Sequence, residues 1–104
     1  MKKKLSLVTI VTEGILKEQF SELLQENGAS GFTITRAEGQ GSRGLRARDW
    51  EGPNLRFEAI VSSAAADQIL AAVEKKYFES YSVIAWVSKV EVVRGEKFVG
   101  EENV

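Results

Sequence analysis

The chain has 104 residues, neither Cys nor His, and a formal net charge of −1 from 14 basic and 15 acidic residues. This length is that of one domain, and the near-neutral charge argues against a protein that coats nucleic acid. Without Cys or His the chain has no disulfides, thiol nucleophiles or imidazole catalysts, and most zinc sites are excluded. We therefore expect no catalytic residues, no metal site and no enzyme of the ordinary hydrolase type.

The N-terminal segment does not predict a membrane span or a signal peptide. The basic start, Met1–Lys4, precedes an apolar run, Leu5–Val11, that Ser6 and Thr9 interrupt. The run is shorter than the roughly 20 apolar residues that span a bilayer, and no small-residue cleavage site follows it. We expect a cytoplasmic protein that does not insert into a membrane.

The first half of the chain predicts a strand, a helix and a second strand. Residues 5–12 are β-branched and almost continuously apolar, as in a strand covered on both sides. A helical stripe follows and ends at Asn27-Gly28. Its apolar members are Leu16, Phe20, Leu23 and Leu24. Residues 31–37 then predict the second strand.

The second half repeats this order. Residues 54–61 alternate apolar with polar and predict a half-exposed strand, and Ser62-Ser63 offers hydroxyls to cap a helix. The apolar stripe of that helix is Ala66, Ile69, Leu70, Val73 and Tyr77. A last strand, about residues 83–93, places Ile84, Trp86, Val90 and Val92 on one face. We interpret Trp86 as core or subunit interface rather than as a platform for a cofactor.

The order βαββαβ predicts an α+β fold, the ferredoxin-like sandwich with an antiparallel sheet. Right-handed crossovers place both helices on one face of that sheet, with the first and third strands central. The continuous apolar character of the first strand fits a central position.

A long loop between the second and third strands carries the strongest functional signal. Residues 38–54 exceed an ordinary hairpin connection, and they include four Gly and three Arg. Glycine backbone and Arg side chains together favour a phosphate site, although a solvated hairpin tip remains the alternative. The motif G-x-G-x-x-G from Gly39 to Gly44 precedes no helix, so the Rossmann interpretation fails. Trp50 is either a loop anchor or a contact for a partner.

Several segments resemble the PII-like signalling proteins, especially the bicarbonate-transporter-associated and carboxysome-associated ones. The most specific is Gly39-Gln-Gly-Ser-Arg43 with Arg46, which follows the strand that starts at Gly31-Phe-Thr33. The other similar segments are Leu7–Glu13, Asn27–Thr35, Lys76–Tyr81 and Gly95–Gly100. The resemblance implies one PII-like domain over residues 1–104, with the family's T-loop at about residues 39–54.

The resemblance also implies a homotrimer with an adenine nucleotide in each cleft between subunits. The expected ligand is ADP or AMP, with ATP or cyclic AMP as alternatives and bicarbonate as a candidate second ligand. Thr33, Gly39 and Gly41 would line the cleft at the base of the T-loop. Ser42, Arg43 and Arg46 would hold phosphate. The turn with Ser82 and Val83 and the tail with Gly95, Lys97 and Phe98 would close the far side from the neighbouring subunit.

This chain departs from the relatives at two places. It has Val83 where the cyanobacterial proteins have Gly, and its tail lacks their paired cysteines, which favours the carboxysome-associated branch. The implied function is a non-enzymatic sensor that reports nucleotide and inorganic carbon through the T-loop to a bicarbonate transporter or a carboxysome-related protein. The alternative is another ferredoxin-like trimer, of the divalent-ion-tolerance (CutA-like) type, or a small-metabolite enzyme.

Overall fold

The computed structural model describes residues 2–39 and 53–99 and has the expected α+β architecture. Its elements are β1 (Lys2–Glu13), the 3-10 helix η1 (Gly14–Leu16), α1 (Lys17–Glu26), β2 (Thr33–Ala37), β3 (Asn54–Val61), α3 (Ser63–Tyr77), β4 (Ile84–Val93) and α4 (Glu96–Val99). The predicted order βαββαβ is confirmed. The sequence did not predict α4, because four residues are too few to show a helical period.

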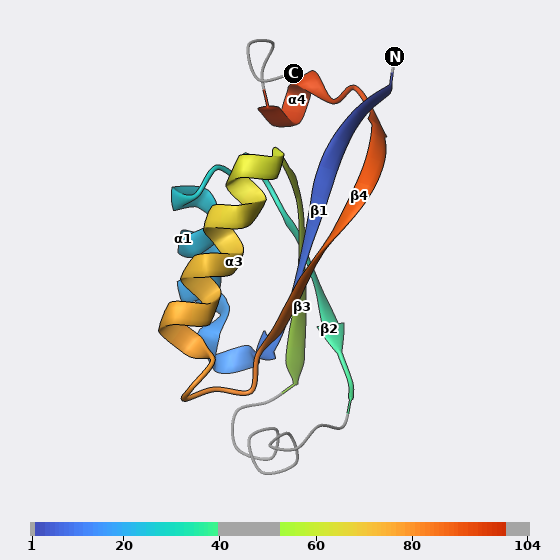
Figure 1. Ribbon diagram of the computed structural model, residues 1–104. Helices are drawn as coiled ribbons and strands as arrows, with labels where there is room; N and C mark the ends of the chain where they lie inside the picture. Colours follow the sequence, from blue (N-terminus) through green and yellow to red (C-terminus); the bar gives the residue numbers. More distant parts are fainter. Residues whose placement is uncertain (1, 40–52, 100–104) are drawn as a thin grey trace.

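The four strands form one antiparallel sheet in the order β2-β3-β1-β4, so the first and third strands are central as predicted. Both long helices, α1 and α3, lie on the same face of this sheet (Figure 1). β1 is longer than its apolar run indicated, because Lys2, Lys3 and Lys4 continue the ladder opposite residues 91–93 of β4. Apolar residues mark only the buried part of a strand, whereas the backbone pairing of β1 continues into its solvent-exposed N-terminal end.

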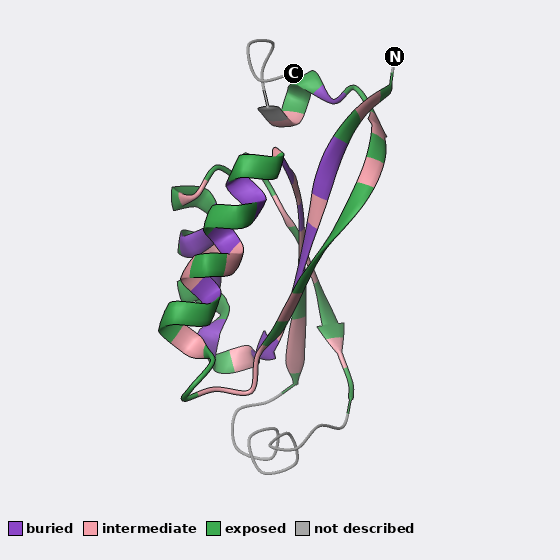
Figure 2. Ribbon diagram, in the orientation of Figure 1, coloured by how far each residue is buried: buried purple, intermediate pink, exposed green. Residues whose placement is uncertain are grey.

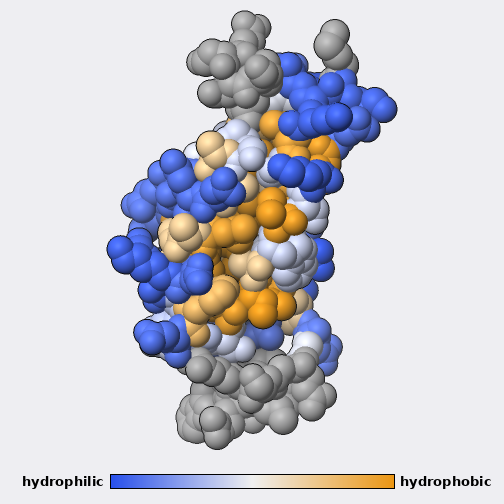
Figure 3. All heavy atoms as spheres, viewed as in Figure 1, coloured by the Kyte–Doolittle hydropathy of each residue, from blue (hydrophilic) through white to orange (hydrophobic). Residues whose placement is uncertain are grey.

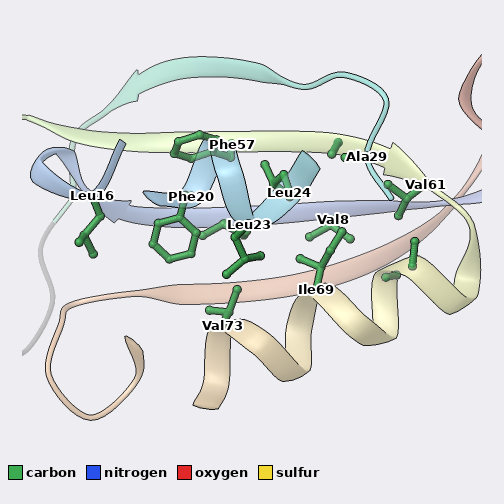
Figure 4. Packing of buried hydrophobic residues seen from close by; sticks show 14 residues of the cluster. Val8, Leu16, Phe20, Leu23, Leu24, Ala29, Phe57, Val61, Ile69 and Val73 are labelled. Carbon is green, nitrogen blue, oxygen red and sulfur yellow. The ribbon is translucent and has the colours of Figure 1, made fainter. Parts of the chain in front are cut away.

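The core fills the space between the helices and their face of the sheet (Figure 4). Phe20 of α1 and Phe57 of β3 are completely buried, with their ring centroids 6.0 Å apart. Val8 and Ile10 of β1 complete the floor, since alternate residues of a strand point to the same face. Buried residues accordingly line the inner side of the helices, and exposed residues cover the outer side (Figure 2).

Both predicted helix boundaries have the expected chemistry. Ser62 caps α3, since its hydroxyl oxygen accepts a hydrogen bond from the backbone N–H of Ala65 at 3.1 Å. At the end of α1, Gly28 adopts a φ of +104°, which glycine adopts without steric cost. The chain then turns back, and the backbone N–H of Ala29 donates to the carbonyl of Leu24 at 2.9 Å.

The opposite face of the sheet, called the helix-free face because neither α1 nor α3 covers it, carries the apolar residues predicted on one side of the last strand. Those residues are Ile84, Trp86, Val90 and Val92, and they pair with Val11, Thr9, Leu5 and Lys3 of β1, respectively. The four β1 partners alternate along their strand with the core residues Val8 and Ile10, so they lie on the face opposite to the core. Within the described chain, Trp86 keeps 39% of its surface exposed and therefore lies outside the core. The predicted core position is therefore excluded, and the predicted subunit interface stays a prediction.

Among the described residues, no helix is long and apolar enough to cross a membrane.

Candidate functional site

A cavity of about 640 Å³ lies beside α4 and the start of β2. It contains three of the predicted site residues, namely Thr33, Lys97 and Phe98. The remaining lining residues are Leu7, Ser30, Gly31, Phe32, Glu58 and Ile60. The register aligns Leu7 with Ile60 and Thr33 with Glu58, so this cavity opens on the helix-free face.

The cavity combines apolar walls with a few polar groups, the usual composition of a small-molecule site. Phe32, Phe98 and Ile60 offer apolar surface to a ring, and the hydroxyl of Thr33 can donate or accept a hydrogen bond. The ammonium of Lys97 lies 5.9 Å from the ring centroid of Phe98. A ligand with an aromatic ring and hydrogen-bonding edges suits these groups.

Glu58 and Ser30 are the two polar wall residues that were not predicted from the sequence, and Glu58 is the charged one. Its carboxylate forms an ion pair with the guanidinium of Arg56 at 3.4 Å, and Arg56 in turn lies 5.9 Å from the ring centroid of Trp86. The three side chains connect the cavity to the middle of the helix-free face. The alternation of Arg56 and Glu58 with apolar residues had indicated only a half-exposed strand, because a single sequence does not reveal which strands are neighbours.

Gly95 brings α4 to this cavity. Just before it, Arg94 adopts a left-handed φ of +64°, and the chain reverses after β4. Gly95 is buried, and a Cβ at this position would lie 2.7 Å from the Cβ of Lys3 on β1. The N–H of Phe98 then donates to the carbonyl of Gly95 at 3.0 Å. Gly95 is thus a close-packed turn residue that positions Lys97 and Phe98, and its predicted ligand contact stays a prediction.

A second group of predicted residues lies at the other end of the sheet, where β2 ends and β3 begins. Gly39 is exposed, and a Cβ there would meet no atom within 4 Å. Ser82 and Val83 form the turn into β4, and Val83 packs against the core. The phosphate residues predicted from the loop, Gly41, Ser42, Arg43 and Arg46, lie outside the described residues.

Glu13 holds this turn in place, although the sequence showed it only as part of a similar segment. Its carboxylate accepts a hydrogen bond from the backbone N–H of Ser82 at 2.5 Å. Glu13 is the last residue of β1 and is only 8% exposed. It also pairs with Asn54, the first residue of β3, so one residue connects the turn to the base of the long loop.

Tyr77 and Tyr81 anchor the turn from the helix side. Their ring centroids lie 5.9 Å apart, and Tyr77 also stacks on Phe20 at 4.7 Å. Burial raises the pKa of Tyr77, and the charges of Tyr81 and Glu22 raise it further. The contacts of its ring with Phe20 and Tyr81 make Tyr77 a packing residue at this turn.

The two groups of site residues are far apart within one chain. The ten residues of β4 separate Val83 from Arg94, a length of about 30 Å for an extended strand. Thr33 is the first residue of β2 and Gly39 lies just beyond its end, about 20 Å away by the same rise per residue. One chain therefore cannot close both groups around one small ligand.

This architecture defines a small α+β protein with one antiparallel sheet and its long helices on one face. The profile of the nitrogen regulatory protein P-II family matches residues 5–97, and the chain belongs to this family. Its structure is similar to that of a PII-like signalling protein from Thermus thermophilus, with 51% sequence identity and a TM-score of 0.83. That match covers 94% of this chain and 98% of the other.

Two structures of the PII-like protein CPII from Thiomonas intermedia are also similar. One holds ADP, AMP and bicarbonate, with 27% identity, a TM-score of 0.83 and coverage of 95% of this chain and 97% of that one. The other holds ADP, AMP and acetate, with 28% identity, a TM-score of 0.80 and coverage of 95% and 98%. The PII-like resemblance of the sequence is thereby confirmed.

Proposed function

We propose that this protein is a non-enzymatic regulator that forms a homotrimer and binds an adenine nucleotide, ADP or AMP, in clefts between neighbouring chains. The observation that carries this proposal is the separation of the two groups of site residues at opposite ends of one sheet. CPII, a relative of similar fold and length, binds ADP and AMP, which supports the choice of ligand.

Each cleft is formed by two different parts of the protein, one from each of two neighbouring chains. One chain supplies the cavity at α4, where Ile60 and Phe98 face the adenine and Thr33 and Lys97 supply polar contacts. Its neighbour supplies the loop base at Gly39 and the turn at Ser82 and Val83. The phosphates then meet Gly41, Ser42, Arg43 and Arg46 of the loop, whose backbone and guanidinium donors suit phosphate oxygens.

The helix-free face supports the trimer. Ile84 keeps 58% of its surface exposed opposite Val11, and Trp86 lies opposite Thr9 on the same face. The register partners Leu7 and Ile60 continue this face further along the sheet. Apolar surface of this kind is removed from water when chains associate. Burying this face also brings the cavity of one chain toward a neighbour, because the cavity opens on the same side.

Bicarbonate is the proposed second ligand, since CPII binds it together with ADP and AMP. In this proposal the loop takes different conformations with and without ligand, and a bicarbonate transporter or a carboxysome-related protein recognises one of them. Nucleotide binding would then report energy status and inorganic carbon together. Membership of the P-II family favours this regulatory role over the CutA-like alternative.

Mixed trimers test the shared cleft. Chains with Phe98→Ala lack the cavity half, and chains with Arg43→Ala lack the loop half, so each variant alone should bind ADP poorly. In any mixed trimer, one of the three clefts joins the intact loop of one chain to the intact cavity of the next. Refolding the two variants together in equal amounts should therefore restore about a quarter of the wild-type sites.

Isothermal titration with ADP and AMP, with and without bicarbonate, measures that capacity. Co-refolded Phe98→Ala with wild type controls for the procedure itself. A mixture that binds no better than its two parents would mean that both halves act within one chain, and the shared cleft would be rejected. Light scattering on the same samples checks independently that they are trimers.

A further inference from the structure

A second cavity, of about 500 Å³, lies at the start of α3 and contains none of the proposed nucleotide residues. Its lining residues are Lys4, Leu5, Ser6, Ser63, Lys89, Val90 and Glu91. Ser6 alternates with the core residues Val8 and Ile10, so its side chain is on the helix-covered face of the sheet. The nucleotide cavity opens on the opposite face, so the two sites are distinct.

The environment of Ser6 indicates that the cavity binds a polar ligand. It is only 1% exposed, and its register partners are Val61 on one side and Lys89 on the other. Its hydroxyl has no hydrogen bond to any part of the chain that the structure describes, although it lines the cavity. Buried polar groups in proteins almost always have a hydrogen-bond partner. A ligand oxygen in the cavity would supply one.

The start of α3 adds donors to the same cavity. The hydroxyl of Ser62 accepts from Ala65, and the carbonyl of Ser62 accepts from Ala66. Within the described ranges, the backbone N–H groups of Ser63 and Ala64 have no acceptor, as expected for the first turn of a helix. The dipole of this 15-residue helix favours negative charge at that position.

The charged residues around the cavity give it a positive balance. Lys4 and Lys89 both line it. Glu91 lines it too, but its carboxylate is paired with the ammonium of Lys2 at 3.8 Å. Lys89 lies directly opposite Ser6 in the ladder, on the same face. Hydrophilic residues gather at this end of the β1–β4 pair, near the N-terminus (Figure 3).

We propose that this cavity is a second binding site, selective for a phosphate group carried by a small organic molecule. The phosphate oxygens accept from the Ser6 hydroxyl and from the first N–H groups of α3, and Lys89 and Lys4 balance the charge. The volume exceeds what one phosphate ion needs, so the cavity has room for the organic part. The site stands independently of the proposed nucleotide function.

Amide NMR spectroscopy of the full chain tests this site residue by residue. The probes are inorganic phosphate, glycerol phosphate and glycerol, each added at constant ionic strength to protein saturated with ADP. Both phosphates should shift the amide signals of Ser6, Ser63 and Ala64, and glycerol should not. Glycerol phosphate should bind more tightly than inorganic phosphate, because its glycerol part occupies cavity volume that a phosphate ion leaves empty.

Lys89→Gln should weaken glycerol phosphate binding about tenfold, since it removes a charge-assisted contact. Lys75→Gln is the matched control. It also removes one positive charge, but from the last turn of α3, whereas the cavity lies at the first turn of that helix. Lys89 and Lys75 are both exposed, so neither change disturbs the core. Equal weakening by the two variants would show general attraction to lysines and would overturn the proposal. So would signals at residues 6, 63 and 64 that do not respond to either phosphate.

Discussion

Glu13 and Ser82, 69 positions apart in the sequence, are joined by a hydrogen bond from the backbone N–H of Ser82 to the carboxylate of Glu13. The bond ties the end of a central strand to the turn that leads into the edge strand β4. Glu13 is almost completely buried there. Acidic residues are rarely buried without a partner, and the N–H of Ser82 is the partner of this one. In the proposed cleft, this bond sets the shape of the turn against the neighbouring chain.

Glu13→Ala should lower stability and nucleotide affinity together. It leaves the N–H of Ser82 without its acceptor, a loss of about 1–3 kcal/mol in the free energy of unfolding. Glu13→Gln keeps an amide oxygen that can accept from the same N–H, so it should retain most of the stability. Urea unfolding and ADP titration measure the two effects. Wild-type stability in Glu13→Ala would show that the turn does not depend on this bond.

Gly95→Ala should displace α4. The new Cβ would lie 2.7 Å from the Cβ of Lys3, a contact that the packed backbone has to relieve by moving. Overpacking of this kind costs about 1–3 kcal/mol. Gly31→Ala is the control, since a Cβ there meets no atom within 4 Å. Thermal unfolding should separate the two variants, and equal melting temperatures would contradict the close packing at Gly95.

The strands, the long helices and their order could be predicted because each has a clear period. Phe20 and Leu24 mark a helical stripe, and the alternation through Phe57 marks a half-buried strand. Ser62 announces its helix by the chemistry of a cap. Each of these signals comes from residues that lie close together in the sequence, and a single sequence contains signals of that kind.

The grouping of the site residues could not be predicted in the same way. Thr33 and Gly39 are close in sequence, but an extended strand separates them, so Thr33 shares a cavity with Lys97 and Phe98 instead. That neighbourhood depends on the reversal at Arg94, where a non-glycine residue adopts a positive φ. Neither residue type nor spacing indicates such a turn. Glu13 was missed for a similar reason, since its partner is a backbone group distant in sequence.

Tyr77 should make the protein less stable at alkaline pH. Its pKa in the folded protein is raised above the usual value of 10.0, first by burial and then by Tyr81 and Glu22. The unfolded chain therefore loses this proton at lower pH than the folded one. The resulting stability is complete below about pH 10 and is lost as the pH rises through the folded-state pKa.

Tyr77→Phe keeps the ring that stacks on Phe20 and removes the ionisable hydroxyl. Its free energy of unfolding should fall less steeply than that of the wild type above about pH 10. Urea unfolding at a series of pH values gives both curves. If the two curves fall in parallel, the loss of stability at alkaline pH comes from ionisable groups other than Tyr77.

Arg43→Ala should weaken ADP binding about tenfold or more, because a hydrogen bond to a charged group contributes about 1.5–3 kcal/mol. Arg46→Ala should affect ADP at least as much as AMP if it reaches beyond the first phosphate. Adenosine has no phosphate and serves as the control ligand, with nearly equal affinity for wild type and both variants. If both variants bind ADP like the wild type, the loop arginines do not hold phosphate.

Ile84→Glu should prevent assembly of the proposed trimer. Ile84 is 58% exposed on the helix-free face, where a carboxylate would have to be buried between chains without a partner. Ile15 in η1 is 57% exposed and lies outside the sheet, so Ile15→Glu makes the same chemical change at a matched exposure. Light scattering after size exclusion should report about one chain mass for Ile84→Glu and three for Ile15→Glu. ADP affinity should be lost with the trimer, since each cleft needs two chains. An Ile84→Glu trimer that still binds ADP would place the subunit contact on another surface.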